Sequence, residues 1–205
     1  MARDAFVGLK ALYLAELTDE DELTYETPVD IGTKAGAVSI SASREISTDA
    51  AYANDDTWIE AETDSGGTGT LEIRDILTDS TVRETIAKLT GYRITTEGDL
   101  LATDVPSKPC ALLCEQSGYI HGRRKCFYKI KMRKPDFEAQ TKEGSTTIGS
   151  LSIPFSFYKV KLADGVITST RDSFYGNSTY ADFFNAVVKT YTERSNSGTN
   201  SGTNS

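Results

Sequence analysis

The chain has 205 residues, 38% of them hydrophobic and 9% aromatic, so it is long enough for one domain with its own core. Its net charge of −8 argues against general affinity for DNA or RNA, which depends on Lys and Arg neutralising phosphates. No signal peptide or membrane span is predicted, and with three cysteines we expect reduced thiols in a cytoplasm.

The first predicted element is a strand over residues 7–17, where apolar side chains occupy alternate positions. An acidic, irregular loop is predicted over residues 18–34, because no Lys or Arg lies between Lys10 and Lys34 and because Pro28 and Gly32 interrupt regular structure. Four carboxylates of this loop are candidate contacts with another molecule: Asp19, Glu20, Asp21 and Glu22.

Alternation of apolar and polar residues predicts three further strands, over residues 38–46, 58–63 and 71–74. The run Asp64-Ser65-Gly66-Gly67 predicts a hairpin turn between the second and the third. The polar, acidic residues 48–56 connect the first two, and we interpret them as the tip of a long hairpin that projects from the body. Candidate contacts near this tip are Tyr52, Asp55, Asp56 and Trp58.

A short helix is predicted over residues 81–90, with Thr81 and Glu84 as a capping box and Gly91 as the stop. A hairpin is then predicted over residues 108–134, and its second strand is strongly basic. Alternation places Cys126, Tyr128, Ile130 and Met132 on one face of that strand and a largely outward, basic face opposite. Three of the bases are candidate contacts: Arg123, Arg124 and Lys125.

The last predicted elements lie between residues 147 and 191. Residues 147–162 read as a central strand covered on both faces, because apolar residues occupy both parities. Asp164-Gly165 predicts a type I′ hairpin, and the spacing of aromatic and apolar residues over 179–191 predicts an amphipathic helix.

These elements predict a mainly β fold, an antiparallel β-sandwich or open barrel with one or two short flanking helices. We expect residues 1–194 to form a single domain. Residues 195–205 contain only Ser, Gly, Thr and Asn and predict a flexible tail.

The sequence offers little for catalysis, and we expect neither an enzyme nor a cofactor. The chain has a single His, and its Gly-rich run at 65–70 lacks the Lys of a P-loop. Carboxylate pairs such as Glu60 and Glu62 are the only basis for a hydrolase. Four residues have partial zinc-ligand spacing, but a structural role for the cysteines is favoured over a metal site or a redox pair: Cys110, Cys114, His121 and Cys126.

The charge is divided along the chain. Residues 1–104 carry 8 Lys and Arg against 22 Asp and Glu, a net −14, whereas residues 105–205 carry 14 against 8, a net +6. Such blocks are often solvated surface, but they also make one copy complementary to the next, and head-to-tail contacts of that kind build rings or filaments. We therefore expect Arg123, Arg124 and Lys125, changed together to Glu, to block assembly of a folded monomer.

The order of these features resembles the major tail proteins of long-tailed, non-contractile bacteriophages, which build the tail tube. The resemblance covers most of residues 6–190. It rests on Val7-Gly8-Leu9-Lys10-Ala11-Leu12-Tyr13-Leu14-Ala15 before the acidic loop, on Gly36-Ala37-Val38-Ser39-Ile40-Ser41-Ala42-Ser43, on Tyr52-Ala53-Asn54-Asp55-Asp56 followed by Trp58-Ile59-Glu60-Ala61-Glu62, and on Gly66-Gly67-Thr68-Gly69-Thr70-Leu71-Glu72-Ile73.

The resemblance implies a structural virion protein, assembled in the host cytoplasm, whose copies form hexameric rings that stack into a tube. Its partners would be further copies of itself, a tape-measure protein, and tail terminator and distal tail proteins. Genomic DNA would pass through the lumen without specific binding, and no membrane would be involved. The 46–63 hairpin and the 18–34 loop would then contact neighbouring rings.

The alternative from a different class is a β-sandwich module that binds carbohydrate or a cell surface. Trp58, the only Trp, and the ten Tyr residues motivate it, since exposed aromatic rings stack on sugars. Trp58 is equally suited to be an anchor for packing or for a protein interface.

Overall fold

The computed structural model describes residues 6–53, 56–74, 79–118, 120–135 and 150–191, with the backbone alone for 6–7, 47–53 and 56–63. The fold is mainly β, with a large antiparallel sheet and two short helices, α1 (Gly32–Ala35) and α2 (Ser80–Thr90), which confirms the predicted fold class. The strands are β1 (Phe6–Asp19), β2 (Thr24–Tyr25), β3 (Val29–Asp30), β4 (Ala37–Ala53), β5 (Asp56–Ile73), β6 (Tyr92–Ile94), β7 (Leu100–Ala102), β8 (Pro109–Gly118), β9 (Arg123–Met132), β10 (Leu151–Tyr158), β11 (Val160–Lys161), β12 (Ile167–Thr168) and β13 (Thr170–Phe174).

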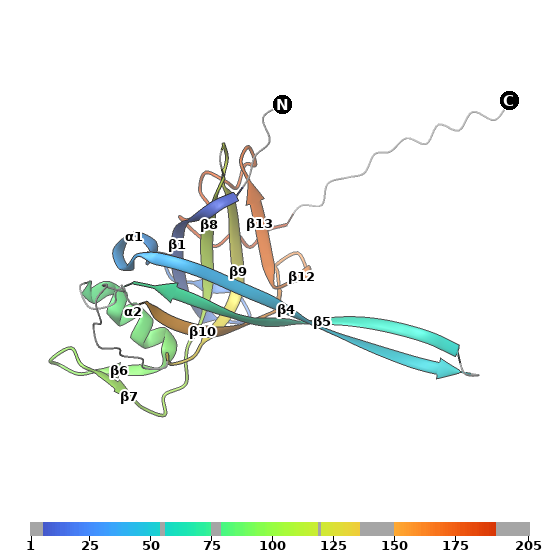
Figure 1. The fold of residues 1–205 in the computed structure, drawn as a ribbon, viewed down its shortest axis with the longest axis horizontal. Coiled ribbons are helices and arrows are strands. Elements are labelled where there is room, and N and C mark those ends of the chain that lie inside the picture. The colour runs from blue at the N-terminus through green and yellow to red at the C-terminus, as the bar shows by residue number, and fades with distance from the viewer. Residues whose placement is uncertain (1–5, 54–55, 75–78, 119, 136–149, 192–205) are drawn as a thin grey trace, which may run out of the picture.

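The main sheet folds over on itself. Its strands follow the order β2-β1-β8-β9-β10-β5-β4, with β3 beside β1 and β13 beside β9. β13 pairs with residues 123–127 of β9 and β10 pairs with residues 129–132, so two strands share one edge of β9. In Figure 1, β1, β8, β9 and β13 stand steeply, whereas β10, β5 and β4 run across them. The two groups of strands enclose the core between them.

Two hydrophobic cores lie on opposite faces of β1, β8 and β9. The larger core fills the space toward β5 and β10 and is closed by the helices; its buried members include Leu12, Leu14, Leu71, Ile73, Val82, Ile86, Leu89, Leu112, Ile130, Phe155 and Phe157. The smaller core lies beneath the C-terminal segment, residues 175–191. Its members include Ala111, Leu113, Cys126, Tyr128, Val160, Leu162, Phe183 and Val187. β8 is therefore covered on both faces.

A bulge in β9 changes which side chains share a face. Cys110 of β8 pairs with Ile130 while Leu112 pairs with Phe127, so two residues of β9 stand opposite one residue of β8. The predicted grouping of Cys126 and Tyr128 with Ile130 and Met132 is therefore wrong. Cys126 and Tyr128 lie in the smaller core, and the bulge returns Ile130 and Met132 to the larger core beside Phe127.

Three local signals predicted a different geometry from the one observed. The run Asp64-Ser65-Gly66-Gly67 is not a turn, because β5 continues through it. The cap of α2 is Asp79, which accepts the N–H of Val82 at 3.1 Å, rather than Thr81; Gly91 ends the helix as predicted. Asp164-Gly165 does join β11 to β12, but Leu162 pairs with Val166 across a three-residue loop in place of a two-residue type I′ turn.

Two longer predictions also need correction. β10 is central in the sheet as predicted, but only one of its faces is buried, since Ile153, Phe155 and Phe157 alternate with less buried residues. The 18–34 segment is not wholly irregular, because β2, β3 and α1 add short ordered pieces beside β1.

The predicted helix over residues 179–191 is wrong, and separate turns take its place. The N–H groups of Tyr180 and Asn185 each bond the carbonyl three residues earlier, and this pattern does not extend into a helix. Distant side chains instead bind the carbonyls: Tyr128 donates to Val188 and Arg171 donates to Thr190. Apolar residues of this segment are nevertheless buried, since Phe183 and Val187 belong to the smaller core. The 195–205 tail lies outside the described residues.

Candidate assembly surfaces

The largest candidate surface is the outer part of the β4–β5 hairpin, which we name the arm (residues 46–53 and 56–64). β5 pairs with β10 only through residues 67–73, whereas its pairing with β4 continues to Asp56 opposite Ala53. The arm therefore extends beyond the body, as Figure 1 shows. The long hairpin proposed from the sequence is present, and Tyr52, Asp56 and Trp58 lie on its strands. Asp55 lies outside the described residues.

Glycines shape the root of the arm. Gly66 has a φ of +108° where the β4–β5 register shifts between Glu45 and Ile46, so it is the bulge residue from which the arm departs. At Gly67 and Gly69 the rings of Phe157 and Phe155 cross β5, and a Cβ atom would lie only 2.6 and 2.5 Å from their Cζ atoms. The absence of a side chain at these glycines is what admits the two rings.

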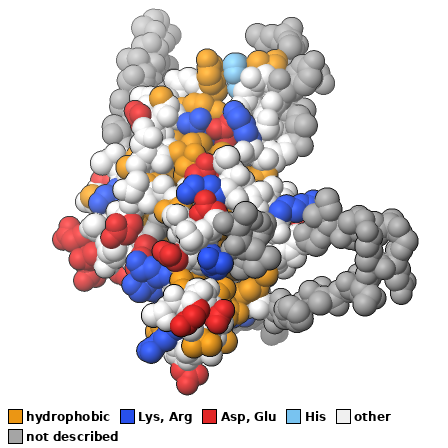
Figure 2. All heavy atoms as spheres, turned by 90° about the vertical axis from the view of Figure 1, so that its left-hand side faces the viewer, with side chains coloured by type: hydrophobic (Ala, Val, Ile, Leu, Met, Phe, Trp, Pro, Cys, Tyr) orange, Lys and Arg blue, Asp and Glu red, His pale blue; other side chains and the backbone are white. Residues whose placement is uncertain are grey.

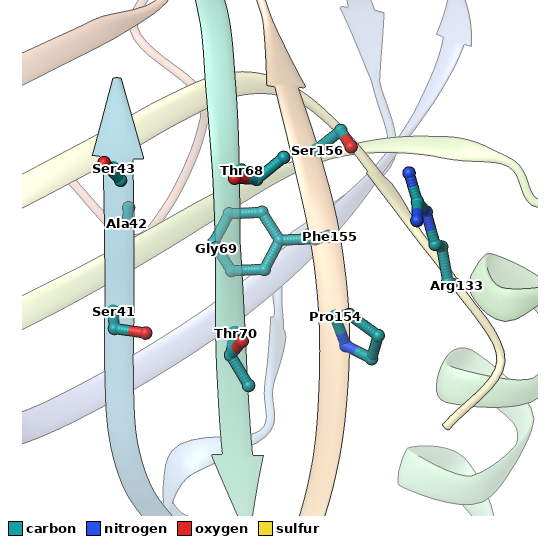
Figure 3. A pocket seen from close by; sticks show the side chains of 10 residues that line it. All are labelled: Ser41, Ala42, Ser43, Thr68, Gly69, Thr70, Arg133, Pro154, Phe155 and Ser156. Carbon is teal, nitrogen blue, oxygen red and sulfur yellow. The ribbon is translucent and has the colours of Figure 1, made fainter. Parts of the chain in front are cut away.

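The face of the sheet beside the arm root is lined with hydroxyl groups. A shallow hollow of about 460 Å³ runs over β4, β5 and β10. Figure 3 shows the Phe155 ring lying across Gly69 and Arg133 standing apart from the strands. The hydroxyl residues that line the hollow are Ser41, Ser43, Thr68, Thr70 and Ser156. Short neutral side chains of this kind suit a surface that faces water or one that contacts another protein.

The acidic loop lies against the body through contacts within the chain. The carboxylate of Asp19 accepts the N–H groups of Asp21 and Glu22 at 2.9 and 3.0 Å, which closes the turn after β1. Glu20 forms an ion pair with Lys129. All four predicted carboxylates are exposed, but the loop already meets a base of β9 in its own chain.

The three predicted bases of β9 are also paired within the chain. Arg123 and Lys125 both reach Asp172 of β13, at 2.9 and 3.2 Å. Arg124 binds Glu115 at 2.7 Å, a carboxylate whose side chain is only 3% exposed. The face is therefore half-buried and largely neutralised, rather than a free basic strip. Figure 2 likewise shows red and blue side chains interspersed on one face of the molecule. The ion pairs Lys108–Glu16 and Lys129–Glu20 join the two blocks of charge in the sequence.

Arg124 is the centre of this cluster. Its guanidinium lies over the rings of Tyr180 and Phe184, with centroid distances of 3.9 and 4.7 Å, and donates to the Tyr180 carbonyl. Glu115 also accepts a hydrogen bond from Lys10 of β1 at 2.9 Å. One buried carboxylate thus connects β1, β8, β9 and the C-terminal segment. This role of Glu115 could not be predicted from the sequence, because its partners come from distant parts of the chain.

Stability is expected to fall in acid through this cluster. Burial disfavours the charged form of Glu115, but hydrogen bonds from Lys10 and Arg124 outweigh it and keep the pKa of Glu115 below its ordinary value. A carboxyl whose pKa is lowered by folding stabilises the native state above its unfolded pKa of about 4.3, and this contribution disappears as pH falls through the lowered value. In urea titrations, the difference in unfolding free energy between wild type and Glu115→Gln should shrink from pH 7 to pH 3. A constant difference would contradict this role.

The cysteines and the single His do not form a common site. Cys110 and Cys114 are buried in the larger core and Cys126 in the smaller one, and all three thiols are free. Burial raises the pKa of Cys114 to about 12, so its thiolate is scarce at neutral pH. His121 stacks on Tyr175, with ring centroids 4.1 Å apart. Within the described ranges, no three His, Cys, Asp or Glu side chains come together as a metal site.

The chain matches no family model and no curated protein. Among the helices in the described part of the chain, none has the length and hydropathy required to cross a bilayer.

Proposed function

We propose that this protein is a structural subunit that binds copies of itself and builds stacked rings, as in the tail tube of a long-tailed phage. The observation that carries the proposal is the arm. A two-stranded ribbon is marginally stable alone in water, so the eight or nine residues of β4 and β5 that leave the body need a partner surface.

A second feature supports the proposal. β4 is the last strand of the sheet path, and no strand in the described part of the chain pairs with its outer edge. Long, unpaired edges are uncommon in monomers, because they template pairing with other chains. Edge-to-edge pairing between copies would close such sheets into a continuous barrel, with the hydroxyl-lined face as a wet surface. The implied class is a non-catalytic virion protein whose further partners are a tape-measure protein, tail-end proteins and DNA in transit.

The proposal is tested by imaging the full chain in negative stain, with and without tail initiators and tape-measure protein. Rings or tubes of uniform width are expected. Particles that remain monomeric at every concentration with these partners supplied would contradict the proposed function.

A further inference from the structure

A hollow of about 620 Å³ lies between the acidic loop, β9, β11 and the end of the C-terminal segment. It is separate from the arm root hollow and from the Arg124 cluster. Four lysines line it, Lys129, Lys159, Lys161 and Lys189. Three carboxylates of the acidic loop, Glu20, Asp21 and Glu22, line its rim as well, so the lysines exceed the carboxylates by one. We name it the lysine groove.

Internal contacts compensate only part of the positive charge in the lysine groove. Lys129 is paired with Glu20. Lys189 donates to the Glu22 carbonyl oxygen at 3.4 Å, which leaves its charge without a paired carboxylate. Lys161 is exposed and forms no ion pair or side-chain hydrogen bond with any residue that the structure describes.

The arm has the opposite charge. Between Arg44 and Arg74 the sequence contains eight Asp and Glu and no Lys or Arg. Each arm strand has about eight or nine residues beyond the body, which at about 3.3 Å per residue gives a length near 30 Å. The arm thus carries acidic groups away from the body.

The outer part of the arm extends away from the lysine groove of its own chain. Lys159 of the lysine groove is close enough to the arm root to lower the pKa of Asp64, although the backbone N–H of Gly66 is the larger cause. From that root the ribbon runs outward in Figure 1, so its outer part moves away from the lysines beside which it begins.

We propose that the lysine groove of one copy receives the acidic arm of a second copy. The inference rests on the proposed function and names the receiving surface. The contact is heterologous, since arm and groove are different surfaces, and each copy gives an arm and receives one. Such a contact propagates from copy to copy.

Charge reversal with rescue tests this pairing. One full-length variant carries Asp56→Lys and Glu60→Lys on the arm, and a second carries Lys159→Glu and Lys161→Glu in the groove. Each should lower the sedimenting, assembled fraction at least tenfold while the far-ultraviolet circular dichroism stays unchanged. All four substitutions in one chain should restore assembly to within twofold of wild type, because the new lysines of the arm can then pair with the new glutamates of the groove.

The matched control reverses two exposed bases that line neither the groove nor the hydroxyl-lined hollow, Arg93→Glu and Lys131→Glu. Combined with the arm reversal, these changes should give no rescue. Rescue by the control pair, or wild-type assembly of the groove variant, would overturn the proposed pairing. Binding of a short DNA duplex that the groove variant alone loses, with no effect on assembly, would assign the groove to phosphates and also overturn it.

A second measurement separates this inference from the proposed function. Unlabelled and ¹⁵N-labelled full chains are mixed and treated with a carbodiimide, which condenses a carboxylate with an amine. Trypsin releases the arm in one peptide, residues 45–74. Mixed-isotope products joining this peptide to Lys159 or Lys161 are expected even where no tube forms. If tubes form but these products are absent, the inference fails and the proposed function stands.

Discussion

Replacing Gly66 with Ala should lower the free energy of unfolding by roughly 2–4 kcal/mol, because it adds backbone strain and overpacking at one point. Gly66 has a φ of +108°, which an L side chain rarely adopts. A methyl group there would also collide with the carbonyl oxygen of Phe157 and lie 3.3 Å from the Tyr158 Cα atom. Both atoms belong to the backbone at the end of β10, so relief requires a shift between β5 and β10.

Urea unfolding of the full chain measures this loss, and Gly8→Ala is the matched control. A Cβ atom on Gly8 would meet nothing within 4 Å, and its φ is not in the left-handed region. Gly8→Ala should change stability by less than about 0.5 kcal/mol. Equal effects at the two glycines would show that the bulge at the arm root is not sterically required.

Arg124→Met should cost about 3 kcal/mol of stability, since it removes one partner of a buried ion pair and leaves the other behind. The Met side chain can still pack on Tyr180 and Phe184, so the loss reports mainly the charge and the hydrogen bonds to Glu115 and the Tyr180 carbonyl. Lys10 remains bonded to Glu115 and limits the loss.

The control is Arg133→Met, an exposed residue whose side chain has no ion pair with the described residues, and it should be nearly neutral. The double variant Glu115→Gln, Arg124→Met should be less destabilised than the sum of the single changes, because the two groups interact directly. Additive losses would show that Arg124 stabilises the protein through another contact.

The Arg124 cluster also changes how the basic strand must be tested. Changing Arg123, Arg124 and Lys125 together to Glu would place new carboxylates against Glu115 and Asp172. We therefore expect that variant to unfold, contrary to the sequence-based expectation of a folded monomer that fails to assemble. Variants of the exposed lysine groove avoid this difficulty.

Local patterns in the sequence were sufficient to predict β1, α2, the β8–β9 hairpin and a projecting hairpin between residues 38 and 63. The predicted connection over residues 48–56 was too long, because β4 continues to Ala53 and β5 begins at Asp56. Each has an alternation or a helical spacing that does not depend on distant residues. The same local patterns located the acidic loop and the basic strand. They could not predict that these two elements pair with each other through Glu20 and Lys129.

The incorrect predictions have a common physical cause: residues distant in the sequence determine the local geometry. Gly66 and Gly67 have the composition of a turn, yet β5 continues through them, because β4 pairs with both residues and Phe157 of β10 lies across Gly67. The segment after Thr179 has helical spacing, yet Arg124, Tyr128 and Arg171 bind its carbonyls. None of these partners can be identified from neighbouring residues alone.

The position of β1 next to β8 governs the order in which a nascent chain can fold. Glu16 pairs with Cys110 and Phe6 pairs with Gly118, so roughly a hundred residues must leave the ribosome before β1 meets β8. The β4–β5 ribbon, by contrast, joins strands that follow each other in the chain. During synthesis, this ribbon can therefore form well before the domain that will hold it, and chaperones would meet it first.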